Sequence, residues 1–179
     1  ELLLTRCNME NINLAIIEDD KIIRESLESF MGDHPAIQIS IVAGSVEDFF
    51  DQIEQALRPP QVDLVLLDIG LPGMSGIECV RRLRDEVPDI QVIMLTVSDD
   101  QDHIFKALEM GATGYLLKHA PAEEMFRAIR EVRGGGAPMS GYIARKVVQS
   151  FRKEHSETAL AQRLTGREEE VLGLLAQGF

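Results

Sequence analysis

Residues 62–76 read VDLVLLDIGLPGMSG, an apolar run that ends at Asp68 and continues into a loop of glycine, proline and serine. The run does not alternate strictly between polar and apolar side chains, which is typical of a strand buried on both faces of a parallel sheet. Pro72, Gly73 and Gly76 predict a turn soon after it. The segment therefore predicts a buried strand with a carboxylate at its C-terminal end.

Four other short apolar runs have the same character, and amphipathic helical patterns lie between the runs. Strands are expected at residues 13–17, 37–42, 62–67, 91–95 and 114–117. The first helix is expected near residues 21–31. Two helices direct apolar stripes to the core, namely Ile22, Ile23, Leu27 and Phe30 in the first and Met125, Phe126, Ile129 and Val132 in the fifth. Five successive strand–helix units predict an α/β fold with a doubly wound parallel sheet.

Three helix starts carry capping signals, in which a serine hydroxyl accepts a hydrogen bond from an exposed backbone amide. The pairs are Ser45 with Asp48, Ser75 with Glu78, and Ser98 with Gln101. We therefore expect helices to begin directly after these serines.

Polar side chains close four of the five strand runs. Glu18 and Asp19 follow the first run, Asp68 the third, Thr96 the fourth and Lys118 the fifth. Ligands of open parallel sheets bind beyond the C-terminal ends of the strands, so these side chains should meet at one edge. Carboxylates suit a hard cation such as Mg²⁺, and an ammonium pairs with a phosphate oxygen. The group predicts phosphoryl transfer to an aspartate.

Composition limits the function classes that remain. The chain has 179 residues, of which 45% are hydrophobic, and a formal net charge of −12. This charge argues against nonspecific nucleic-acid binding by the chain as a whole. Cys7 and Cys79 lack metal-site spacing, and the three leucines at residues 2–4 are too few for a signal peptide or a membrane span. We expect a cytoplasmic protein with reduced thiols and no membrane contact.

The chain is expected to divide into four segments. Residues 1–10 are expected to be an N-terminal extension or a cloning remnant, and residues 11–134 to form the compact domain. The glycines at 134–136 and Pro138 end the fifth helical pattern, so residues 135–163 are expected to form a linker with a short helix. Ile143, Val147, Val148 and Phe151 have helical spacing in this linker. A second helical element is expected from residue 164.

Four separated motifs resemble the receiver domain of two-component response regulators. They are IIEDD at residues 16–20, LLDIGLPGMSG at 66–76, LT at 95–96 and GYLLK at 114–118. Each one lies at the end of a predicted strand, and all four occur in the family's order. The resemblance covers residues 11–134 and implies a flavodoxin-like (βα)5 fold.

The resemblance implies roles for the residues at the sheet edge. Asp68 would accept a phosphoryl group from a sensor histidine kinase. Glu18, Asp19, Asp68 and the backbone carbonyl of Gly70 would hold Mg²⁺. The motif alignment leaves Asp20 outside this set, as a solvated loop residue.

Three further residues match the family's switch apparatus. Thr96 and Lys118 would contact phosphoryl oxygens, and Tyr115 resembles the aromatic residue whose rotamer couples to that threonine. Two positions depart from the commonest pattern, because His119 stands where proline is usual and Gly70 carries no side chain. His119 borders the expected pocket and is a weaker candidate for a role in it.

The last sixteen residues, LTGREEEVLGLLAQGF at 164–179, resemble the opening of the LuxR-type helix-turn-helix of the NarL/FixJ branch. The chain stops before a recognition helix, so DNA binding would need the part of that all-α domain that is missing here. This ending is expected of a truncated chain or a fragment of a longer transcription regulator.

These patterns predict a response regulator rather than an enzyme. Phosphorylation on Asp68 would shift the receiver to an active state, promote a homodimer and, in a full-length protein, control DNA binding and transcription. One alternative is a receiver that acts only through protein–protein contacts, without DNA output. A less favoured one is a phosphotransferase with an aspartate nucleophile, because Gly70 occupies the position of the second aspartate that such enzymes use.

Overall fold

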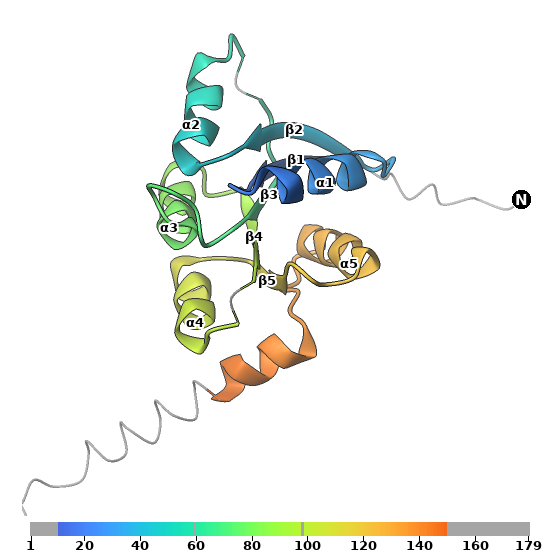
Figure 1. Cartoon of the computed structure of the whole chain (residues 1–179), viewed down its shortest axis with the longest axis vertical. Helices are drawn as coiled ribbons and strands as arrows, with labels where there is room; N and C mark the ends of the chain where they lie inside the picture. The colour runs from blue at the N-terminus through green and yellow to red at the C-terminus, as the bar shows by residue number, and fades with distance from the viewer. Residues whose placement is uncertain (1–10, 59, 98, 150–179) are drawn as a thin grey trace, which may run out of the picture.

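A computed structural model describes residues 11–58, 60–97 and 99–149, and its core is a five-stranded parallel sheet (Figure 1). The strand order is β2-β1-β3-β4-β5. The strands are β1 (Ile12–Ile17), β2 (Ile37–Ala43), β3 (Leu64–Leu67), β4 (Gln91–Thr96) and β5 (Gly114–Leu117). The helices are α1 (Lys21–Gly32), α2 (Val46–Gln55), α3 (Gly76–Glu86), α4 (Gln101–Met110) and α5 (Ala122–Arg133). This doubly wound order confirms the predicted flavodoxin-like fold.

Helices cover both faces of the sheet, with α1 and α5 on one side and α2, α3 and α4 on the other (Figure 1). Successive strand residues point to opposite faces. Leu14 and Ile16 therefore pack with α1 and α5, whereas Ala15 and Ile17 belong to the core beneath the other three helices. Burial on both faces explains why the strand sequences are almost continuously apolar.

The predicted apolar stripe of α1 is correct except at Ile22. Leu27 is buried, and Ile23 and Phe30 are partly buried against the sheet, but Ile22 is 79% exposed. Ile23 lies four residues before Leu27 and shares its face of the helix, whereas Ile22 lies five residues before it and is rotated away. The predicted stripe of α5 is confirmed, because Met125, Ile129 and Val132 are buried and Phe126 packs against them.

Two of the three predicted helix caps are confirmed. The Ser45 hydroxyl accepts from the amide of Asp48, and Ser75 and Glu78 form a complete capping box. The third prediction is wrong, since α4 begins after Asp100, whose carboxylate accepts from two amides of the first turn. Aspartate and serine satisfy the same amides equally well, so the local pattern did not separate the two candidates.

Asp20 also has a structural role that the sequence did not indicate. Its exposed carboxylate caps α1 by accepting from the amides of Ile22 and Ile23. It is therefore the N-cap of α1 and not merely a solvated loop residue.

The chain after α5 packs back against the sheet. The amide of Tyr115 in β5 donates to the carbonyl of Pro138 at 3.0 Å, and Met139 forms a parallel bridge with Tyr115. The predicted short helix follows at residues 141–149, and its Ile143 is fully buried in the core. The compact unit therefore continues past Gly134, where the sequence predicted its end.

Several predictions lie outside the described residues. These concern the N-terminal extension at 1–10, the later part of the linker and the helix-turn-helix segment at 164–179, and they stay predictions. Within the described part of the chain, no helix has both the length and the apolarity needed to cross a membrane.

Candidate functional site

The C-terminal ends of the strands bring the predicted polar residues together. Backbone hydrogen bonds continue the strand pairing into this edge, from the amide of Asp68 to the carbonyl of Ile17 at 3.0 Å and from that of Lys118 to the carbonyl of Thr96 at 2.9 Å. The pairing of the strands therefore determines where the backbone of each functional residue lies. Glu18, Asp68 and Thr96 are buried there, at 1%, 6% and 2% exposed.

The ammonium of Lys118 bridges two of the buried carboxylates. Its Nζ lies 2.9 Å from Oδ2 of Asp68 and 2.7 Å from Oε2 of Glu18. The amide of Ile69 donates to the other Asp68 oxygen, Oδ1, at 2.7 Å. The Asp68 carboxylate is thus held from both sides in one orientation.

Negative charge exceeds positive charge at this site. Glu18, Asp19 and Asp68 can each offer a carboxylate oxygen, with these oxygens all within 4.8 Å of one another, and Lys118 supplies one positive charge among them. Like charges this close repel strongly in a partly buried site, so a bound cation would relieve the repulsion. An all-oxygen set of ligands suits a hard cation such as Mg²⁺.

Burial and charge shift the ionisation of this group. Burial raises the pKa of Glu18 above its ordinary value, although the hydrogen bond and the charge of Lys118 act in the opposite direction. Burial alone would lower the pKa of Lys118, but its hydrogen bonds and the two carboxylate charges outweigh burial and leave that pKa raised. Lys118 is therefore held in its charged form beside Asp68.

The predicted switch residues lie next to this group. Thr96 is the last residue of β4, and Tyr115 in β5 is fully buried in the core beneath α2, α3 and α4. Burial raises the pKa of the Tyr115 phenol above its usual value, so the ring stays neutral.

Residues 14–130 match the family model of the response regulator receiver domain. The chain belongs to this family. Among its relatives, the transcriptional regulatory protein DegU of Brevibacillus brevis is 28% identical, over 96% of this chain and 78% of DegU. The regulator YxjL of Bacillus subtilis is 31% identical over the same shares, and the nitrate/nitrite response regulator NarL of Escherichia coli is 29% identical. The predicted family and its role in two-component signalling are confirmed.

Solved structures agree with this assignment. A LuxR-family response regulator from Aurantimonas sp. SI85-9A1 is 25% identical with a TM-score of 0.70, over 79% of this chain and 98% of that one. The isolated receiver domain of RcsB from Salmonella enterica, determined in the presence of a phosphomimetic, has a TM-score of 0.69 over 76% of this chain and 99% of that one. At 15% identity it supports the fold alone.

Two glycines of the receiver loop adjoin Asp68. A Cβ on Gly70 would lie 3.7 Å from Oδ2 of Asp68, an ordinary contact, so any side chain here would stand beside the carboxylate. A Cβ on Gly76 would lie 1.9 Å from the Asp68 carbonyl oxygen, which is not possible without movement. The start of α3 therefore packs directly on the backbone of Asp68, a contact that the sequence showed only as a turn.

Sequence reasoning also missed Arg24. Its guanidinium donates to the backbone carbonyls of Glu18 at 2.6 Å and Asp19 at 3.0 Å, and so fixes the loop that presents both acids. An arginine in the first turns of a helix carries no local signal for such a contact. His119, the weaker sequence candidate, is exposed and borders a separate hollow of about 450 Å³ with Asp99 and Tyr142.

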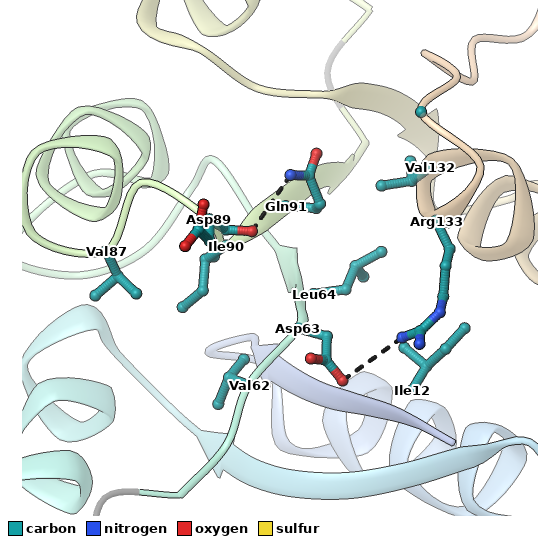
Figure 2. A pocket seen from close by; sticks show the side chains of 11 residues that line it. Ile12, Val62, Asp63, Leu64, Val87, Asp89, Ile90, Gln91, Val132 and Arg133 are labelled. Atoms are coloured by element: carbon teal, nitrogen blue, oxygen red, sulfur yellow. Dashed lines mark hydrogen bonds and ion pairs between the residues drawn. The ribbon is translucent and has the colours of Figure 1, made fainter. Parts of the chain in front are cut away.

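Another pocket lies at the opposite end of the receiver sheet. It has a volume of about 370 Å³, and Figure 2 shows Asp63 and Arg133 facing each other across it with a closest N–O distance of 3.8 Å. Its lining includes Ile12 and Leu64 near the N-terminal ends of β1 and β3. None of the predicted site residues lines it.

Proposed function

We propose that Asp68 of this response regulator accepts a phosphoryl group from a phosphohistidine of a sensor kinase. The arrangement of Asp68, Glu18 and Asp19 beside Lys118 carries the proposal. It places an oriented Asp68 carboxylate next to two further carboxylates and one ammonium group. Glu18, Asp19, Asp68 and the Gly70 carbonyl would hold Mg²⁺. When bound, the metal neutralises charge as a phosphoryl group approaches the carboxylate.

In the transfer, an oxygen of Asp68 forms a bond to phosphorus while the bond from phosphorus to the histidine nitrogen breaks. Lys118 already touches Oδ2 of Asp68 at 2.9 Å, so a small movement pairs its ammonium with a phosphoryl oxygen. The hydroxyl of Thr96 donates to another oxygen, and Tyr115 follows it by a change of rotamer. These contacts exist only with phosphate present, so they shift the receiver toward an active state.

The proposed output is a homodimer that regulates transcription in a full-length protein. The relatives named as transcriptional regulators support this. DNA contact would come from the helix-turn-helix part, in a cytoplasmic signalling protein that is not an enzyme for small substrates. The same relatives disfavour a receiver without DNA output.

The test of metal-dependent phosphorylation is the intact mass of the chain after incubation with a small phosphodonor. With Mg²⁺ we expect one acid-labile phosphoryl adduct per chain, because the cation offsets the repulsion between carboxylates and phosphate. With EDTA in place of Mg²⁺ we expect none. Equal modification in both samples would contradict the proposed metal role.

The exposed Ile22 gives a prediction for kinase docking. Ile22 lines a groove of about 380 Å³ together with Phe30, Met125 and Lys118, so this apolar surface opens beside the acceptor site. A kinase must bring its phosphohistidine to Asp68 and therefore must cover a neighbouring surface. We expect Ile22→Glu to slow transfer from a phosphorylated kinase about tenfold, the loss of one modest interface anchor.

The same variant should react with a small phosphodonor at the parent rate, because no catalytic group is changed. Leu57→Glu is the matched control, since Leu57 is also exposed but follows α2, away from this groove. Rapid-quench experiments at subsaturating kinase measure the rate of transfer from the kinase, and a separate assay measures the rate with the small phosphodonor. Equal slowing by both variants would point to a general charge effect instead.

A further inference from the structure

The segment after α5 contacts both parts of the receiver that carry the proposed switch residues. On the β5 side, the amide of Tyr115 donates to Pro138, and Ile143 belongs to the same core cluster as Tyr115. Gly114 leaves room for this approach, because a Cβ there would lie 2.8 Å from the Pro138 ring. The linker is thus built into the edge of the sheet next to Tyr115.

On the β4 side, the helix at 141–149 contacts Asp99, which lies just before the N-cap of α4. The hydroxyl of Tyr142 donates to Oδ2 of Asp99 at 2.5 Å, and Nζ of Lys146 lies 3.2 Å from the same oxygen. The Lys146 ammonium also donates to the Asp99 carbonyl, and the side-chain amide of Gln101 donates to the Lys146 carbonyl at 2.9 Å. Asp99, Tyr142 and Lys146 are called the Asp99 latch below.

The contacts of the latch are solvent-exposed and therefore easily broken. The side chain of Asp99 is 52% exposed and that of Lys146 is 22% exposed, and ion pairs with this much solvent add little to stability. Hydrogen bonds from Tyr142 and Lys146 hold the pKa of Asp99 below its usual range, so the carboxylate stays charged and bonded at neutral pH. Ile143, by contrast, is fully buried and anchors the helix to the core.

We propose that the Asp99 latch transmits the phosphorylation state of Asp68 to the linker helix at residues 141–149. The proposal rests on the function proposed above. Asp99 lies three residues beyond Thr96 along the chain, so a movement of Thr96 toward a phosphoryl group is expected to displace Asp99, which Tyr142 and Lys146 contact. The latch opens, and the helix loses its hold on Asp99 and on α4.

The direction of the signal follows from the position of this helix in the chain. It is the last described element before the segment that resembles a helix-turn-helix, so a change in its hold on the receiver passes toward the output end. Coupling is reciprocal, because a contact that phosphorylation weakens must itself oppose phosphorylation. Tyr142 and Lys146 therefore influence how readily Asp68 is phosphorylated, although neither residue belongs to the acceptor site.

Hydrogen exchange of the full chain, followed by mass spectrometry, tests the latch. The intact mass of the same sample reports how much of the chain is phosphorylated. After phosphorylation by a small phosphodonor with Mg²⁺, we expect amides in residues 141–149 to exchange about fivefold faster, at the low end of allosteric coupling. The Asp68→Asn chain given the same donor should show no change.

Variants test the latch from the other side. The double variant Tyr142→Phe and Lys146→Met should show fast exchange in this helix without phosphodonor, and little further gain with it. By reciprocity it should bind the noncovalent phosphomimetic beryllofluoride about fivefold more tightly than the parent does. Arg145→Met is the matched control, because it removes an exposed charge from the same helix and leaves the latch intact. It should behave as the parent does.

Three outcomes would overturn the inference. An adduct on Asp68 with unchanged exchange at 141–149 contradicts transmission through the latch. Parent-like exchange in the unmodified double variant shows that the latch does not hold the helix. Absence of any adduct in the parent contradicts the proposed function, and the proposed transmission by the Asp99 latch falls with it. Hydrogen exchange of the unmodified variants still shows whether the latch holds the helix at 141–149.

Discussion

Asp68→Asn is expected to carry no phosphoryl group under conditions in which the parent chain is fully modified. Asparagine keeps the shape of the side chain but replaces an anionic oxygen with an amide, which is not a nucleophile for phosphorus at neutral pH. The effect should be complete rather than partial. Intact mass after incubation with a small phosphodonor and Mg²⁺ measures it, and Asp51→Asn, at an exposed position on α2, should react like the parent.

This loss should not come from unfolding. The substitution removes one of three carboxylates whose oxygens lie within 4.8 Å of one another, and Lys118 keeps its 2.7 Å contact with Glu18. Relief of like-charge repulsion should therefore leave the thermal midpoint equal to or above that of the parent. An adduct that persists in Asp68→Asn would move the acceptor to another acid, and peptide mapping would identify which one.

Most of the fold and the grouping of polar residues at one sheet edge were predictable, because both depend on one regularity. Short apolar runs that end in a polar residue form buried parallel strands, and the C-terminal ends of such strands share one edge. The strand ends were therefore correct to within one residue, and Asp68, Glu18 and Lys118 were placed together correctly. The strand starts are less sharp, as β3 begins at Leu64 instead of at residue 62.

The remaining features depend on tertiary contacts that leave no local pattern. Arg24 reaches back six residues to the Glu18 carbonyl, and Ile143 reaches the core from beyond a run of glycines that normally ends a domain. Gly76 was recognisable as a turn residue, but nothing in its neighbours reveals that it touches the backbone of Asp68. Such contacts become visible only when the elements are placed in space.

Gly76→Ala is expected to destabilise the chain and to weaken phosphorylation together. The added Cβ would lie 1.9 Å from the Asp68 carbonyl oxygen and 2.9 Å from the Ile69 Cα, so backbone and not a flexible side chain must move. The hydrogen bond from the Gly76 amide to the Ile69 carbonyl, now 3.1 Å, opposes that movement. We expect a loss of about 3 kcal/mol, the upper part of the range for overpacking in a well-packed interior.

Urea unfolding measures this loss, and Gly70→Ala supplies the matched control. Both substitutions add one methyl group beside Asp68, but at Gly70 the new carbon lies 3.7 Å from Oδ2 of Asp68, at ordinary contact distance. Gly70→Ala should therefore change stability by less than about 1 kcal/mol, as expected for an exposed site free of strain. If the two variants were equally stable, α3 would not be packed on the acceptor backbone. If only Gly76→Ala is destabilised and also reacts more slowly with a phosphodonor while still folded, the start of α3 is what holds Asp68 in its reactive position.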